Sequence, residues 1–181
     1  MRTRLKKFFH LIIMLLLASA VSAESPTPMK LSNDALAGKG LGEFAPWPDE
    51  MVIKGNTGHT FSELFSGEIS LGVYKSNPTA LNITSPWPFD ELVAVLSGEL
   101  HLTPAGSKET IVTKAGEMVV VPVTFTGTWE MVGDYRELFV VETKAYLKSQ
   151  EPGGLLSSEG RGQFKGEFAK GVQLLNRVAA N

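Results

Sequence analysis

Residues 91–98 read Glu-Leu-Val-Ala-Val-Leu-Ser-Gly, and residues 116–122 read Gly-Glu-Met-Val-Val-Val-Pro. Each stretch is a short apolar run bounded by turn-forming residues, which is typical of a buried β-strand. Similar runs follow one another from about Ile53 to Val141. The pattern predicts an antiparallel β barrel or sandwich, with a tight turn at Gly98.

Two of these runs support more specific predictions about which faces of the strands are buried. Ile69, Leu71 and Val73 alternate with other residues and should share one face of a strand. Residues 92–96 are nearly continuous in apolar side chains, which predicts a strand that is buried on both faces.

The N-terminus carries four basic residues before an apolar run from Phe8 to Ala18. With the small residues Val21-Ser22-Ala23, this pattern predicts a secretory signal peptide that is cleaved after Ala23. The alternative is an uncleaved anchor, but the run is shorter than the ~20 residues that span a bilayer. We expect a periplasmic or secreted bacterial protein with no membrane association after cleavage.

The composition excludes several classes of protein. Loss of residues 1–23 removes four basic residues and no acidic one, so the 17 basic and 19 acidic residues become 13 and 19, a net charge of −6. An acidic chain without a basic cluster is unsuited to nucleic acid. The sequence contains no cysteine, so its stability depends on a packed core rather than on disulfides.

The chain divides into four segments by composition. Residues 1–23 form the signal peptide, 24–60 an extended N-terminal segment rich in Pro and Gly, 61–145 the β domain, and 146–181 a loop followed by an amphipathic helix. The helix is predicted from apolar residues at helical spacing, namely Phe164, Phe168, Val172 and Leu175. It would pack on the barrel or form a dimer contact.

Two stretches resemble the paired motifs of the cupin superfamily: Pro86–Leu100, with Glu91 and Gly98, and Ala115–Glu130, with Gly116 and Pro122. The ending Phe-Thr-Gly-Thr-Trp-Glu at 125–130 is similar to the branch named after (S)-ureidoglycine aminohydrolase. Residues 72–78 resemble the strand and turn that open the same domain. The resemblance implies an all-β double-stranded β-helix, a jelly-roll barrel, over about residues 67–142.

The same resemblance identifies where a metal-binding cupin would carry its ligands. Two histidines would fall at Ser85 and Trp87, or one residue earlier at Thr84 and Pro86, and a third at Gly127. None of these side chains is a strong metal ligand. Only Glu91 remains, and one carboxylate does not hold a metal, so we expect no metal cofactor. Under an enzymatic alternative the resemblance implies manganese.

Two histidines lie beyond the signal peptide. His101 alternates with Leu100 and Leu102, which take the inward phase, so its side chain should point outward. His59 follows a turn-like segment, and a loop across the mouth of the cavity is one possible position for it.

Trp87, Glu91 and Trp129 are the candidate site residues, with Ser85 beside them. The two tryptophans either fill the barrel or line a pocket in which Glu91 is the polar anchor. Burial in an aromatic cavity raises the pKa of a carboxyl group, which suits a general acid or base. Alternatively, Glu91 only accepts hydrogen bonds from the backbone or an indole.

Three functions are consistent with this sequence. The first is a metal-free module that binds a small molecule through Trp87, Trp129 and Glu91. The second is a hydrolase or isomerase acting on a small ureido or sugar-acid substrate, as the resemblance implies, with Glu91 as the catalytic residue. The third is a structural or interaction protein with a filled barrel. Since cupins commonly pair through their sheets, a homodimer is expected for all three.

Overall fold

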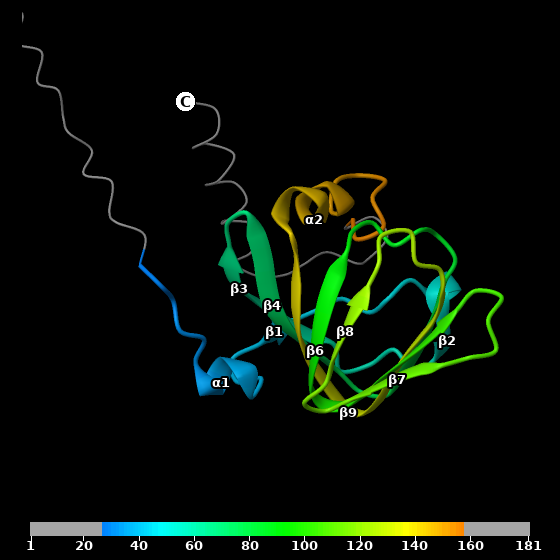
Figure 1. Cartoon of the computed structure of the whole chain (residues 1–181), viewed down its shortest axis with the longest axis horizontal. Coiled ribbons are helices and arrows are strands. Elements are labelled where there is room, and N and C mark those ends of the chain that lie inside the picture. Colours follow the sequence, from blue (N-terminus) through cyan, green and yellow to red (C-terminus); the bar gives the residue numbers. More distant parts are fainter. Residues whose placement is uncertain (1–26, 158–181) are drawn as a thin grey trace, which may run out of the picture. The chain divides into compact units, whose positions relative to one another are not determined.

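The computed structural model describes residues 27–157, and the helices and strands of this range all lie in the unit that begins at Leu31. Two short α-helices and nine strands are present in it (Figure 1). The elements are α1 (Asn33–Leu36), β1 (Gly42–Glu43), the 3-10 helix η1 (Asp49–Met51), β2 (Val52–Lys54), β3 (Thr60–Ser66), β4 (Ile69–Ser76), β5 (Thr79–Ile83), β6 (Glu91–Pro104), β7 (Ile111–Lys114), β8 (Met118–Val121), β9 (Gly127–Glu142) and α2 (Thr143–Ser149). The predicted all-β barrel is confirmed.

Some sequence predictions fall outside this range. The signal peptide at residues 1–23 and the amphipathic helix at Phe164–Leu175 lie outside the described residues. The short helix that follows the barrel is α2, which begins at Thr143, directly after the last strand. Within residues 27–157, no helix has the length and apolar character needed to cross a bilayer.

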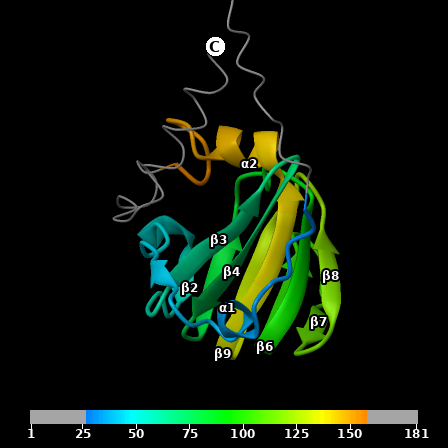
Figure 2. The same ribbon diagram turned by 90° about the vertical axis from the view of Figure 1, so that its left-hand side faces the viewer.

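The strands form one curled antiparallel sheet with the order β1-β3-β4-β9-β5-β2, and β6 pairs with β9, β8 and β7. Figure 2 shows β3, β4, β9 and β6 side by side, with α2 across the end of the sheet. The two longest strands, β6 with 14 residues and β9 with 16, pair along most of their length. Because β9 pairs with β4, β5 and β6, it is the element around which the barrel closes.

Gly98 does not form the tight turn that the sequence predicted. Strand β6 passes through it without a break, and the pairing register with β9 shifts on either side of Ser97. These shifts mark a β-bulge, which bends a strand while leaving it continuous. Gly98 has φ 71°, and a Cβ there would lie 2.4 Å from the carbonyl oxygen of Val132. Gly98 therefore allows β6 and β9 to approach each other closely, and it does not reverse the direction of the chain.

One of the two face predictions needs a correction. In β6, Val93 and Val95 are buried but Leu92 is 37% exposed, so this strand is buried on one face rather than two. In β4, Ile69, Leu71 and Val73 share one face, as predicted. Ile69 is exposed, and the barrel interior receives Tyr74 from the opposite face of this strand.

The inner face of the barrel follows a strict alternation along β9. The odd-numbered residues from Trp129 to Val141 are buried, with the exception of Gly133, and the even-numbered ones are partly or fully exposed. The buried apolar side chains form one cluster that includes residues of the N-terminal segment and of α2. This cluster surrounds a cavity inside the barrel.

Candidate functional site

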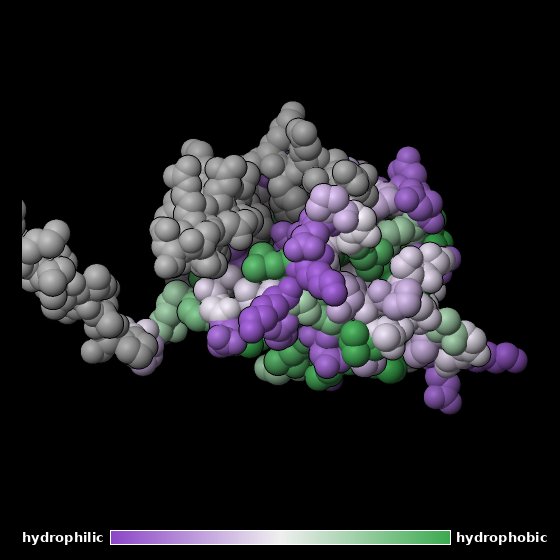
Figure 3. All heavy atoms as spheres, turned by 90° about the horizontal axis from the view of Figure 1, so that it is seen from above, coloured by the Kyte–Doolittle hydropathy of each residue, from purple (hydrophilic) through white to green (hydrophobic). Residues whose placement is uncertain are grey.

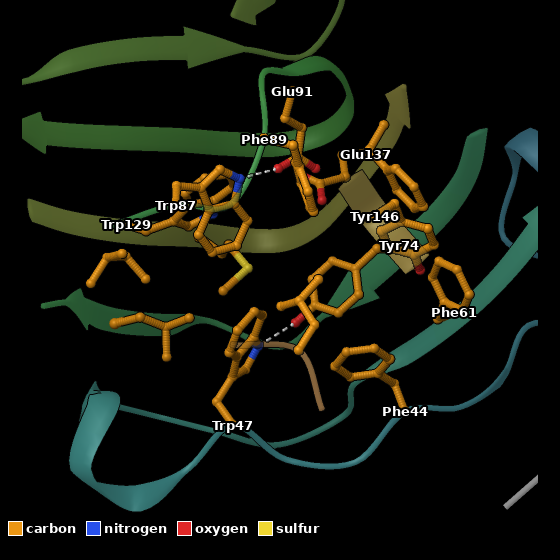
Figure 4. A pocket seen from close by; sticks show the side chains of 15 residues that line it. Phe44, Trp47, Phe61, Tyr74, Trp87, Phe89, Glu91, Trp129, Glu137 and Tyr146 are labelled. Atoms are coloured by element: carbon orange, nitrogen blue, oxygen red, sulfur yellow. Dashed lines mark hydrogen bonds between the residues drawn. The ribbon is translucent and has the colours of Figure 1, made fainter. Parts of the chain in front are cut away.

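A cavity opens inside the barrel, surrounded mainly by aromatic side chains (Figure 4). The volume that the centre of a water molecule can occupy in it is about 70 Å³. One water needs only about 10–15 Å³ on this measure, so the cavity has room for several waters or a small organic molecule. Its lining residues are Phe44, Trp47, Phe61, Tyr74, Leu81, Ile83, Trp87, Phe89, Glu91, Trp129, Met131, Glu137, Phe139, Tyr146 and Leu156.

Trp87 and Glu91 are joined across the start of β6. The indole Nε1 of Trp87 donates a hydrogen bond of 2.9 Å to Oε2 of Glu91, and both residues are buried. Trp87 lies in the loop before β6, whose backbone bonds to the loop before β9 through Thr124 and Phe125. The ring of Trp129, from β9, lies 5.1 Å from that of Trp87 between centroids. These contacts fix the orientation of the Glu91 carboxylate.

Glu137 adds a second carboxyl group to the same wall. It lies on β9, is buried, and accepts a hydrogen bond from the Tyr135 hydroxyl. Figure 4 shows the carboxyl groups of Glu91 and Glu137 close together beside Phe89. Burial raises the pKa of Glu137 to about 7, although the Tyr135 hydrogen bond opposes this shift. Burial, and then the charge of Glu137, raise the pKa of Tyr135 well above its ordinary value.

A hydrogen-bonded chain holds the opposite wall of the cavity. Trp47 Nε1 donates to the Tyr74 hydroxyl over 3.1 Å, and that hydroxyl lies 2.6 Å from Nδ1 of His59. Asn56 bonds the backbone of Trp47 through both its Oδ1 and its Nδ2, and its Oδ1 also lies 3.0 Å from Nε2 of His59. Because Oδ1 is an acceptor, Nε2 carries the imidazole proton. His59 therefore positions Tyr74 and Trp47 from behind the cavity lining.

The structure brings three of the four candidate site residues together. Trp87, Glu91 and Trp129 all line the cavity. Ser85 is exposed and does not line it, because residues 84–90 form a loop in which strand alternation does not apply. Gly127, the second-motif position, has φ 141°, and a Cβ there would lie 2.1 Å from the carbonyl oxygen of Thr103. His101 is partly exposed and bonds Glu99 over 2.8 Å.

Sequence reasoning missed Glu137, although a signal for it was present. Alternation from Trp129, which was expected to point inward, places every odd-numbered residue of β9 inside, including Tyr135 and Glu137. Phe44 and Trp47 were also missed. They lie in the N-terminal segment, where no periodic pattern indicates which side chains are buried.

Comparison with known proteins identifies the domain. Residues 63–146 match the family model of the EutQ-like cupin domain. The chain contains a cupin domain. The match begins in β3 and ends in α2, so it includes the cavity wall formed by β4, β6 and β9 but excludes Phe44 and Trp47. No curated protein matches the sequence.

Solved structures resemble the cupin domain at low sequence identity. The EutQ protein of Clostridium difficile is 17% identical, with 52% of this chain and 76% of that chain covered and a TM-score of 0.37. A protein of unknown function from Pseudomonas syringae pv. tomato is 21% identical, with 56% of this chain and 45% of that chain covered and a TM-score of 0.48. A cupin-like protein from Thermotoga maritima is 17% identical, with 59% of this chain and 80% of that chain covered and a TM-score of 0.43.

Proposed function

We propose that this protein is a small-molecule-binding module whose site is the barrel cavity. The observation that carries the proposal is a mainly apolar, aromatic cavity with two carboxyl groups, Glu91 and Glu137, on one wall. Small-ligand sites in proteins have this character, an apolar enclosure with a few polar groups that orient the ligand. The cupin fold supports many functions, so the argument rests on the site.

The proposal does not require a metal. The positions where the resemblance would place cupin metal ligands are Ser85 and Trp87, or Thr84 and Pro86, and Gly127, and none of these residues is a strong metal ligand. Glu91 is the carboxylate of the same motif, and its Oε2 accepts the Trp87 hydrogen bond. Within residues 27–157, no group of three or more His, Cys, Asp or Glu side chains is placed to hold an ion. This donor set does not fit a transition metal or manganese.

A ligand screen tests the binding function directly. The chain has three tryptophans, and Trp47, Trp87 and Trp129 all line the cavity, so tryptophan fluorescence reports on this site. We expect at least one small molecule both to raise the melting temperature and to change the tryptophan emission. If no compound does either, the barrel has a structural or interaction role. Stoichiometric metal in protein purified without chelator would contradict the metal-free site.

Glu91 provides the variant for the same assay. Glu91→Gln keeps an oxygen that accepts the Trp87 hydrogen bond but removes the charge. We expect this substitution to weaken the affinity for a ligand found in the screen by about tenfold, since a charge-assisted hydrogen bond is lost. Unchanged affinity would exclude Glu91 from ligand contact.

An enzymatic function is the second candidate, and Glu137 favours it. A carboxyl group whose pKa is raised to about 7 by burial is suited to proton transfer near neutral pH. The reaction would be hydrolysis or isomerisation of a small ureido or sugar-acid substrate, as in the (S)-ureidoglycine aminohydrolase branch. Turnover of such a substrate that disappears in Glu137→Gln would establish it. Turnover that is retained in the variant would exclude Glu137 as the acid or base.

The cellular setting is also a proposal. We infer an exported protein that is cleaved after Ala23, because residues 1–23 have the three-part pattern of a signal peptide. Expression of the full chain in bacteria should give periplasmic protein. Its measured intact mass should match a chain that begins at Glu24. A cytoplasmic protein that retains its N-terminus would contradict this. We propose a homodimer, with no nucleic acid or membrane partner.

A further inference from the structure

Tyr135 and Glu137 lie two residues apart on the inner face of β9 and are joined by a hydrogen bond. The Tyr135 hydroxyl donates to Oε2 of Glu137, and both side chains are buried. Within residues 27–157 this hydroxyl has no other hydrogen-bond partner, so its proton is satisfied only while Glu137 accepts it. Oε2 is therefore held as an acceptor, whether Glu137 is ionised or neutral.

The other carboxyl oxygen of Glu137, Oε1, faces the cavity. Glu137 lines the cavity, and Oε1 has no hydrogen-bond partner in the described part of the chain. In that same part, the enclosed side-chain polar atoms that lack a partner are Nε of Arg136 and Nε2 of Gln150. Oε1 is not one of them, so it borders open space. A molecule in the cavity can form a hydrogen bond with it.

The open space of the cavity is bounded by rings that pack on one another. The rings of Trp87 and Trp129 lie 5.1 Å apart between centroids, and those of Phe61 and Phe139 lie 5.5 Å apart. A ligand therefore occupies the open volume of about 70 Å³ rather than a position between these rings. One water needs about 10–15 Å³ on this measure, so the volume suits a molecule the size of a single five- or six-membered ring.

A buried carboxylate in an apolar wall discriminates between ligands by their hydrogen-bonding groups. A ligand with an N–H or O–H group replaces solvent at Oε1 and keeps a hydrogen bond there. A ligand of the same shape without such a group removes the solvent and leaves a buried acceptor unpaired, which costs binding energy. Sites built around a buried polar group therefore reject the analogue that lacks its partner.

We propose that the cavity binds a small, mainly apolar molecule through an N–H or O–H group that donates to Oε1 of Glu137. Tyr135 is the positioning residue, since its hydroxyl occupies Oε2 and leaves Oε1 directed at the cavity. This inference rests on the proposed binding function, because it names the ligand class of the same site.

The protonation of Glu137 gives the site a characteristic pH dependence. The groups that face it are Tyr135 on the same strand, Tyr74 on β4, Glu91 on β6 and Tyr146 on α2. Above a pKa of about 7, Oε1 is an acceptor and favours a ligand with a donor. Below that pKa the proton lies on Oε1, because Oε2 still accepts from Tyr135, and Oε1 then donates. The affinity for a donor ligand should therefore rise with pH through about 7.

Pyrrole and furan are the probes that test the proposal. They are planar five-membered rings of nearly the same size, but pyrrole has an N–H donor where furan has an oxygen that only accepts. Titration of the full-length wild-type chain, followed by tryptophan fluorescence and calorimetry, should show pyrrole binding about tenfold more tightly than furan at pH 8.5. At pH 5.5 this preference should fall below about threefold, because Oε1 is then protonated.

Glu137→Gln reverses the polarity of the site. Its amide oxygen accepts from Tyr135, so its amide nitrogen takes the place of Oε1 and presents a donor to the cavity. At pH 8.5 pyrrole should bind this variant about tenfold more weakly than wild type, and the affinity should not change with pH. Glu109→Gln removes the same charge at an exposed position in the loop between β6 and β7, and should change the pyrrole affinity less than about twofold.

Tyr135→Phe tests the positioning role. The Tyr135 hydrogen bond lowers the pKa of Glu137, so its loss should move the midpoint of the pyrrole pH dependence to higher pH. A residue that only filled space would leave this midpoint where it is in wild type. An unchanged midpoint would therefore overturn the role assigned to Tyr135.

The failures of the two proposals are distinguishable. If furan binds as tightly as pyrrole at pH 8.5, the cavity binds small molecules and the hydrogen-bond anchor is wrong. If pyrrole binds Glu137→Gln as tightly as wild type, Oε1 is not the contact. If neither ring binds although the general screen finds ligands, the ligand class is wrong. If neither ring binds and the screen finds no ligand, the binding function itself is overturned.

Discussion

At the scale of a single residue, Glu137 combines deep burial with a hydrogen bond from the Tyr135 hydroxyl. The bond favours the ionised carboxylate, but desolvation outweighs it and raises the pKa from the ordinary 4.5 to about 7. Neutral Tyr135 and ionisable Glu137 thus form a donor–acceptor pair in the barrel wall. This pair makes the stability of the fold depend on pH.

The first prediction concerns that dependence. The folded protein binds the Glu137 proton more tightly than the unfolded chain does, so the stabilisation from this proton is complete below pH 4.5 and is lost as the pH rises to about 7. Glu137→Gln stays neutral throughout. The free energy of unfolding of wild type relative to the variant should fall between pH 4.5 and pH 7.5, by on the order of 3 kcal/mol. Urea unfolding at a series of pH values measures it.

A matched control separates Glu137 from the other carboxyl groups. Glu109→Gln, at an exposed loop position, should shift the free energy of unfolding by less than about 0.5 kcal/mol at each pH. If the difference between wild type and Glu137→Gln does not change with pH, the carboxyl group titrates normally in the folded state and the burial argument is wrong.

At the scale of the element, the bulge at Gly98 supplies the second prediction. Gly98→Ala places a methyl group 2.4 Å from the Val132 carbonyl oxygen at a positive φ, so β6 and β9 must separate. We expect a loss of about 3 kcal/mol in the free energy of unfolding. Gly106→Ala shares the positive φ, at 77°, but has no atom within 4 Å, and should lose only about 1 kcal/mol. Equal losses would show that the close approach is not a constraint.

The strands of the barrel show what sequence patterns do and do not reveal. Apolar runs located β4, β6, β8 and β9, and motif spacing placed Trp87, Glu91 and Trp129 at one site. Alternation separates the two faces of a strand but does not say which is inside, so Ile69 was not recognised as an outer residue. A glycine with positive φ occurs both in turns and in bulges. The sequence alone therefore could not show which of the two Gly98 forms, because that depends on how β6 pairs with its partner strand.

Some of the residues that line the cavity could be predicted from the sequence, and others could not. Glu137 follows from alternation along β9, once Trp129 is known to point inward. Trp47 and Phe44 lie outside any periodic segment and reach the barrel through contacts distant in sequence, such as the bonds from Trp47 to Asn56 and Tyr74. Whether the tryptophans fill the barrel or line a cavity depends on how side chains from different strands pack together. The sequence does not show this packing.

At the scale of the whole molecule, an apolar row crosses the outer face of the sheet. Pairing registers align one residue from each of five adjacent strands, and none of the five is charged. Hydrophobic residues gather along the lower edge of Figure 3, the side on which β6 and β8 lie at the front of Figure 1. The row consists of Phe65, Leu71, Val140, Leu92 and Val120.

The row ends at β8, whose only strand partner in the described chain is β6. On β8 the side chains of Met118 and Val120 are 68% and 61% exposed. Exposed apolar surface of this extent on an edge strand indicates an association site. An uncharged row can pack on its own copy about a two-fold axis without bringing like charges together. We therefore propose this face as the homodimer interface.

The third prediction follows from that interface. Replacing both Met118 and Val120 with Thr keeps the β propensity of the strand and reduces its apolar surface. A two-fold interface contains four of these side chains, two from each copy, and each would lose about 1 kcal/mol of burial. The dimer dissociation constant should therefore rise roughly a thousandfold. Sedimentation equilibrium measures this constant. The control is Ile53→Thr on β2, a position that is 58% exposed and off the row, and it should leave the constant unchanged. A wild-type protein that stays monomeric at high micromolar concentration would show that this face does not pair with a second copy.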